Sequence, residues 1–120
     1  MQNTMHNATR ASKQRRLHGI IARIWTGRVP PGKADAYDQF LRERAIPDYT
    51  SIQGNLGEII LRRDEQNYTE FTIITFWDSI DSIKAFAGEN YEKAKYYEED
   101  KEYLLEFPEH VKHYKMVECF

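Results

Sequence analysis

The chain has 120 residues, 41% of them hydrophobic and 30% charged, and a formal net charge of −2 at pH 7. This length predicts one domain, and no apolar run approaches the ~20 residues of a membrane-spanning helix, which argues against a membrane partner. The single cysteine, Cys119, excludes an internal disulfide and a cysteine metal cluster, and it favours a reducing, cytoplasmic setting.

Basic and acidic residues are distributed unevenly along the chain. The first 34 positions hold seven basic residues and no acidic one, whereas the remainder holds 10 basic and 19 acidic residues. Because nucleic-acid affinity depends on Lys and Arg neutralising backbone phosphates, an acidic body argues against a nucleic-acid partner. Residues 1–17 offer little apolar surface for burial, so we expect a flexible basic N-terminal tail before a domain that spans residues 18–120.

The first expected elements are a strand and a helix. Residues 19–26 are rich in β-branched and aromatic side chains, which is typical of a strand. Residues 33–45 then place apolar side chains at helical spacing, with Asp35 near the positive end of the helix dipole. We expect this helix to kink or end near Pro47, because proline disfavours the helical conformation of the residue before it.

Two further strands are expected at residues 58–63 and 70–77. The polar break between them, residues 64–67, is four residues long. Strands joined so briefly must pair as an antiparallel hairpin.

A second helix is expected at residues 80–87. Asp78 or Ser79 can serve as its N-cap, and Gly88 stands where a helix commonly ends.

The rest of the chain predicts a short helical piece at residues 92–97, a solvated acidic loop at 98–102 and a final strand at 111–117. The whole order is strand, helix, strand, strand, helix, strand. This order indicates an α+β protein with the ferredoxin-like βαββαβ arrangement on one antiparallel sheet.

The central strands are apolar on both faces. Residues 59–61 and 71–77 contain few polar side chains, although a sheet covered by helices on one side normally alternates apolar and polar residues. A second copy of the same sheet is the simplest element that could bury the open face, so we expect a homodimer.

Eight short segments of the domain belong together: Ile21-Ala22-Arg23-Ile24-Trp25, Ile46-Pro47-Asp48-Tyr49, Gly54-Asn55, Leu61-Arg62-Arg63, Phe76-Trp77-Asp78-Ser79, Ile83-Lys84-Ala85-Phe86-Ala87-Gly88, Ala94-Lys95-Tyr96-Tyr97 and His113-Tyr114. They resemble the antibiotic biosynthesis monooxygenase domain family over about residues 20–118. The resemblance implies a dimeric α+β barrel, in which each subunit keeps a cavity between its sheet and its helices. It leaves the reaction open, because the family includes oxygenases of polyphenols and haem-degrading enzymes.

Haem degradation is disfavoured within this resemblance. The haem-degrading relatives use an Asn on the first strand, a Trp at the end of the third strand and a His as the iron ligand. Trp77 corresponds to that Trp, but residues 23–25 lack the Asn, and Tyr96 and Tyr97 occupy the region where the His is expected. A haem site would therefore lack its proximal ligand.

Arg23, Trp77 and Tyr96 are the candidate catalytic residues. Arg23 interrupts an apolar strand, and its guanidinium needs an acceptor: either a substrate phenolate or an acid such as Glu58 or Glu70. Cofactor-independent oxygenation needs little beyond a dry aromatic pocket and a group that stabilises the phenolate.

Trp25, Tyr97 and His113 are the candidate substrate-binding residues. Trp25 and Arg23 are two positions apart on the first strand, so their side chains leave the same face. Tyr96 and Tyr97 are neighbours in an expected helical piece and point in different directions, so only one of them is expected to face the cavity. His113 shares parity with buried positions of the last strand. It forms no metal pair with His110, because positions i and i+3 of a strand point to opposite faces, and no metal site is expected.

Three functions are compatible with these residues. The favoured one is a cofactor-independent monooxygenase that acts on a small aromatic or polyphenolic compound. The alternative is a non-catalytic dimer of the same fold that binds a small molecule or a partner. An RNA-binding role is disfavoured, because the third strand lacks the basic and aromatic pattern of RNA-binding domains of this topology.

Overall fold

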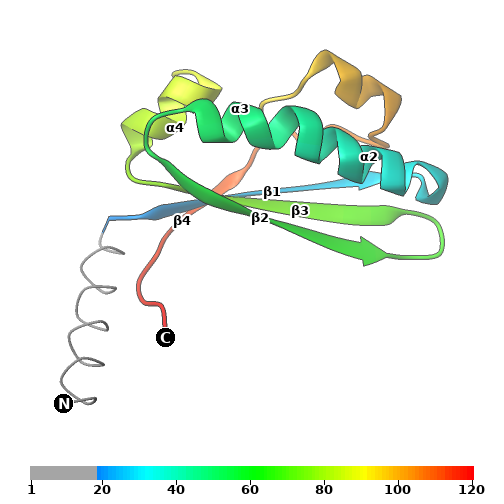
Figure 1. The fold of residues 1–120 in the computed structure, drawn as a ribbon, viewed down its shortest axis with the longest axis horizontal. Coiled ribbons are helices and arrows are strands. Elements are labelled where there is room, and N and C mark those ends of the chain that lie inside the picture. Colours follow the sequence, from blue (N-terminus) through cyan, green and yellow to red (C-terminus); the bar gives the residue numbers. More distant parts are fainter. Residues whose placement is uncertain (1–18) are drawn as a thin grey trace.

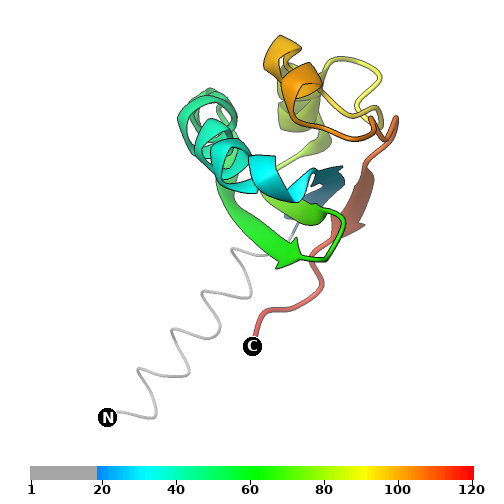
Figure 2. The same cartoon turned by 90° about the vertical axis from the view of Figure 1, so that its right-hand side faces the viewer.

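Four strands form one antiparallel sheet in the order β2-β3-β1-β4 in the computed structural model, which describes residues 19–120. The strands are β1 (Ile21–Val29), β2 (Asn55–Asp64), β3 (Thr69–Trp77) and β4 (Lys112–Lys115). The helices lie on one face of the sheet and leave its other face uncovered (Figures 1 and 2). The predicted α+β class and ferredoxin-like arrangement are confirmed. The expected tail at residues 1–17 lies outside the described residues.

The first helix is longer than the sequence predicts. It follows a short 3₁₀ turn, η1 (Pro31–Lys33), and runs through α2 (Ala34–Phe40), the π-helical segment η2 (Leu41–Ala45) and α3 (Ile46–Ser51). Of the two expectations at Pro47, a kink or an end, the end is wrong, because the helix continues to Ser51. Proline lacks an amide hydrogen and its ring clashes with the carbonyl one turn earlier, and the wider π turn just before it accommodates both effects.

The hairpin of β2 and β3 is antiparallel, as predicted from its short connection. Its register shifts between Asn55 and Gly57, where Gly57 has a φ of 136°. An extra residue in one strand bends the strand and increases its twist. The predicted strand at residues 58–63 therefore begins three residues earlier, on the far side of this bulge.

Helix α4 (Ile80–Ala87) has the predicted bounds. Ser79 caps it, because the Ser79 hydroxyl accepts a hydrogen bond from the Ser82 amide at 3.1 Å. Gly88 follows with a φ of 92°, a positive value that favours glycine over other residues. Among residues 19–120, no helix combines the length and the apolar character needed to cross a bilayer.

The segment between α4 and β4 differs from its prediction. Residues 92–97 are not helical, because their backbone pairs with a later part of the chain: the Ala94 amide donates to the Glu109 carbonyl at 2.8 Å, and the Val111 amide donates to the Glu92 carbonyl at 2.9 Å. Residues 98–102 are not a solvated loop but a 3₁₀ helix, η3 (Glu98–Glu102), whose Asp100 is buried. This whole segment covers the helix side of the sheet (Figure 2).

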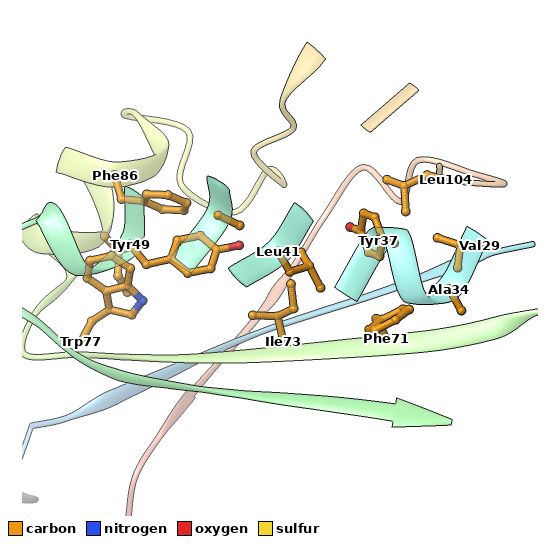
Figure 3. Close-up of a cluster of buried hydrophobic side chains, with 12 residues drawn as sticks. Val29, Ala34, Tyr37, Leu41, Tyr49, Phe71, Ile73, Trp77, Phe86 and Leu104 are labelled. Atoms are coloured by element: carbon orange, nitrogen blue, oxygen red, sulfur yellow. The ribbon is translucent and has the colours of Figure 1, made fainter. Parts of the chain in front are cut away.

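The core lies between the sheet and the helices. Figure 3 shows it from Trp77 at one end of β3 to Val29 at the end of β1, with Tyr49 and Leu41 between them. Apolar burial of this kind is the main favourable contribution to folding. One part of this layer also holds buried charged side chains.

Candidate functional site

Arg23 lies in a polar row that crosses the helix side of the sheet. The register pairs Glu58 of β2 with Thr75 of β3, Thr75 with Arg23 of β1, and Arg23 with His113 of β4. Residues paired directly across antiparallel strands point to the same face. The row therefore places four polar side chains on the side that the helices cover.

The Arg23 guanidinium is held by three acceptors. Its Nη1 donates to the carbonyl of Tyr91, and its Nη2 donates to the carbonyl of Lys93 at 3.0 Å. Nη1 also lies 3.0 Å from Nε2 of His113, which accepts from the guanidinium and is therefore unprotonated at that atom. These contacts fix the guanidinium in place without neutralising its charge.

No carboxylate of residues 19–120 forms an ion pair with Arg23, which is only 4% exposed. Burial lowers the pKa of Arg23 to about 10. The expected alternative, an ion pair with Glu58 or Glu70, is wrong: Thr75 stands between Arg23 and Glu58, and Glu70 points to the open face of the sheet. A buried cation of this kind is costly unless an anion reaches it.

A cavity between the sheet and the helices lies beside this guanidinium. Its volume is about 30 Å³. That is room for about two water molecules, so an aromatic ring fits only when the side chains around the cavity move. Aromatic side chains such as Trp25, Tyr49, Tyr96 and Tyr97 line it, together with the charged side chains of Arg23, Lys95 and Asp100.

Trp25 and Tyr96 form one wall of the cavity. The Trp25 indole Nε1 donates to the Tyr96 hydroxyl at 3.1 Å, and the rings meet edge to face with centroids 6.2 Å apart. The Tyr96 hydroxyl in turn donates to the Pro108 carbonyl. Gly27 makes room for the indole, because a Cβ at that position would lie 2.2 Å from it. Burial raises the pKa of Tyr96, which keeps its hydroxyl neutral.

Tyr97 also lines the cavity, contrary to the expectation that only one of the two tyrosines does so. The helical divergence behind that expectation does not apply, because residues 92–97 are not helical. The Tyr97 hydroxyl donates to Asp48 Oδ2, which also accepts from Lys95 Nζ at 3.1 Å. Burial alone would raise the pKa of Asp48, but these two bonds hold that pKa below its usual value.

Trp77 faces the same side of the sheet as Arg23 but lies behind the cavity wall. It is fully buried, its ring stacks on Phe86 with centroids 5.5 Å apart, and its Nε1 donates to the Thr75 hydroxyl at 2.7 Å. Phe86 does line the cavity. Figure 3 shows Phe86 with Trp77 and Tyr49 at one end of the core. Trp77 therefore supports the wall through Phe86.

His113 contacts Arg23 but does not line the cavity. It lies in a separate, open hollow with Tyr91 and His110. Burial, and then the charge of Arg23, lower the pKa of His113, which suits its role as an acceptor. In the described part of the chain, no group of three or more His, Cys, Asp or Glu residues is arranged to hold a metal ion.

Asp100, Tyr49 and Tyr37 complete the cavity and were not predicted. Asp100 is 3% exposed, and its Oδ2 accepts from the Tyr97 amide at 2.7 Å. The only sequence signal is the spacing Tyr97-x-x-Asp100, in which an acid three residues into a helix reaches back to the N-cap amide. Tyr37 lies within the helical pattern of residues 33–45, and Tyr49 lies in one of the segments that carry the family resemblance.

These features define a ferredoxin-like α+β domain with an aromatic-lined cavity beside a buried cation. The sequence pattern of the antibiotic biosynthesis monooxygenase family matches residues 20–95, more than half of the chain, and the chain belongs to this family. A comparison with curated protein sequences gave no match.

Solved structures share this fold at low sequence identity. A candidate antibiotic biosynthesis monooxygenase from Nitrosomonas europaea is similar with a TM-score of 0.62 and 16% identity, over 83% of this chain and 92% of that one. A second candidate of this kind, from Caulobacter crescentus, has a TM-score of 0.61 and 17% identity, over 85% and 93%. A heme-degrading protein from Mycobacterium tuberculosis has a TM-score of 0.57 and 18% identity, over 84% and 98%. At these identities the likeness shows the fold.

Haem does not fit the cavity described above. A haem group needs an axial ligand, and no histidine of residues 19–120 lines this cavity. Tyr96 and Tyr97, which stand in the region of the expected ligand, already use their hydroxyls in hydrogen bonds to Pro108 and Asp48.

Titration of the protein with haem should therefore give no tight stoichiometric complex. The measurement is the Soret band recorded against the ratio of haem to protein, with free haem in the same buffer as the control. A band shift that saturates at one haem per chain would contradict this prediction.

Proposed function

We propose that the chain is a cofactor-independent monooxygenase that acts on a small aromatic or polyphenolic compound and holds it as a phenolate beside Arg23. The observation that carries this proposal is the buried guanidinium without a carboxylate partner in residues 19–120, at the wall of an aromatic cavity. A phenolate would supply the missing negative charge. Arg23 would stabilise it more strongly there than in water, because the effective dielectric constant is lower.

The proposed reaction needs no other reductant. One atom of O₂ enters the ring as a carbonyl and the other leaves as water, whose two hydrogens come from the phenol hydroxyl and from the attacked ring carbon. The phenol is thereby oxidised to a quinone and O₂ is reduced. The protein's contribution is to bind the ring, favour the electron-rich phenolate and exclude water.

Some of the site residues line the cavity, and the others contact a residue that lines it. Arg23, Tyr96, Trp25 and Tyr97 line it, so we propose direct contact between these side chains and the ligand. Trp77 would act as a positioning residue through Phe86, and His113 through its contact with Arg23.

Replacing Arg23 by glutamine tests the proposal. We expect Arg23→Gln to weaken binding of an acidic phenol by more than ~1 kcal/mol, the scale of a lost hydrogen bond to a charged group. Oxygen consumption with a panel of polyphenols should also fall in Arg23→Gln. Arg42→Gln is the matched control, because that side chain is 71% exposed on the outer face of the first helix.

The outcomes of this test separate the candidate functions. Oxygen consumption that depends on Arg23 supports the monooxygenase. Binding of phenols without oxygen consumption would instead indicate the non-catalytic binding protein. Binding that is unchanged in Arg23→Gln would contradict the proposed role of the guanidinium.

We also propose that the chain forms a homodimer through the open face of its sheet. On this face Ile24, Ile74 and Ile59 are register partners across three strands, and Ile59 is 45% exposed. Leu61 beside them is 50% exposed. Contiguous exposed apolar surface of this kind marks a contact surface, and a second sheet would cover it.

A further inference from the structure

Asp100 is the second buried charged side chain of the cavity. Within residues 19–120 the charged side chains of the buried class are Arg23, 4% exposed, and Asp100, 3% exposed, and both line the same cavity. They come from different layers, since Arg23 belongs to β1 and Asp100 to η3, which covers the sheet. A ligand between these layers would have one group on each side.

The Asp100 carboxyl has no cation beside it among the described residues. Its Oδ2 accepts the Tyr97 amide at 2.7 Å, and the Tyr37 hydroxyl interacts with the carboxyl from α2. The other titratable groups that face it are Tyr49 of α3, Tyr96 and Glu99. These partners orient the carboxyl, but none of them carries a positive charge.

The Tyr49 hydroxyl is influenced by both buried charges. This hydroxyl points along the core, away from Trp77 and towards Leu41 (Figure 3). The charge of Asp100 raises the pKa of this hydroxyl, and the charge of Arg23 lowers it. A phenol hydroxyl at a neighbouring position would experience both charges as well.

We propose that Asp100 is the proton acceptor that converts a bound phenol into the phenolate held by Arg23. This inference rests on the proposed function and adds a residue to it. In the step, the O–H bond of the phenol breaks, a new O–H bond forms on the Asp100 carboxylate, and the negative charge passes from the carboxylate to the phenol oxygen. No electron is transferred and no other reactant is required.

The energetic reason lies in the placement of the charges. Before the step, the cavity contains a buried carboxylate without a cation and a buried guanidinium without an anion, and each is disfavoured by its loss of water. After the step the carboxyl is neutral and the negative charge lies beside the guanidinium. Burial raises the pKa of Asp100, which makes its carboxylate a stronger base than an exposed one.

Proton release on binding of 4-nitrophenol tests the proposal. This probe shows its ionisation state in its visible spectrum, and its nitro group blocks the ring carbon opposite the hydroxyl. The full-length protein is mixed with the probe in weakly buffered solution at a pH below the solution pKa of the probe. Bound phenolate is read from absorbance, and released protons are read from a pH indicator.

We expect the wild-type protein to form bound phenolate with no net proton release, because Asp100 keeps the proton. The isosteric change Asp100→Asn removes the acceptor, so each bound phenolate should then release one proton to the solvent. Glu98→Gln is the matched control on the same 3₁₀ helix, where the Glu98 side chain is 82% exposed, and it should behave as the wild type.

The outcomes distinguish this inference from the proposed function. One proton released per bound phenolate in the wild-type protein would overturn the role of Asp100 and leave the phenolate site intact. Absence of bound phenolate in the wild-type protein would overturn the proposed function and the role of Asp100 with it. Because the wild-type measurement decides between these outcomes by itself, it holds even if Asp100→Asn does not fold.

Discussion

Trp77→Ala should lower the free energy of unfolding by about 3–5 kcal/mol, the usual cost of truncating a buried large aromatic side chain. Trp77 is fully buried, and the change would remove its stacking on Phe86 and its hydrogen bond to Thr75. The cavity left behind would not refill, because β3 and α4 are each held by their own backbone hydrogen bonds. Chemical denaturation at one fixed protein concentration measures the effect.

Trp77→Phe is the matched control for this change. It keeps an aromatic ring against Phe86 and loses the indole nitrogen, so most of the stability should remain. A loss below about 1 kcal/mol in Trp77→Ala would contradict the packing described here. A loss of activity in Trp77→Phe without a loss of stability would point to direct contact with the ligand instead of support through Phe86.

Ile59→Lys should dissociate the proposed homodimer. A lysine at this position is tolerated in the single chain, where Ile59 is 45% exposed, but a second sheet would bury its charge without a partner. Such burial costs several kcal/mol, so we expect the dissociation constant to rise by at least about 100-fold, which corresponds to roughly 2.8 kcal/mol.

Analytical ultracentrifugation across micromolar concentrations measures this change. Gln39→Lys is the control, because it adds the same charge on an exposed position of α2. A wild-type protein that sediments as a monomer, or an Ile59→Lys protein that remains dimeric, would contradict the proposed interface.

The sheet and α4 could be predicted from sequence because their signals are local. The hairpin of β2 and β3 follows from a polar break too short for any connection except an antiparallel turn. The bounds of α4 follow from its N-cap Ser79 and from Gly88 beyond its end. In each case the deciding residues lie next to the element that they define.

The cavity could be predicted only in part, because its geometry depends on contacts distant in sequence. The residues 92–97 carry a helical pattern, but their backbone bonds to residues 109–111 prevent the helix. Asp100 lies in an acidic run whose sequence predicts exposure to solvent. Only the fold of the covering segment buries this side chain. Arg23 was a candidate because a charge inside an apolar strand is visible in the sequence itself.

The small cavity also has a kinetic consequence. Arg23 holds the carbonyls of Tyr91 and Lys93, and Asp48 holds the side chains of Lys95 and Tyr97, so both groups of bonds tie down the same covering segment. A ligand larger than the roughly 30 Å³ available needs the surrounding side chains to move, and those of Lys95 and Tyr97 belong to this segment. Association is then limited by opening, and the observed binding rate should level off as the ligand concentration rises, far below the diffusion limit.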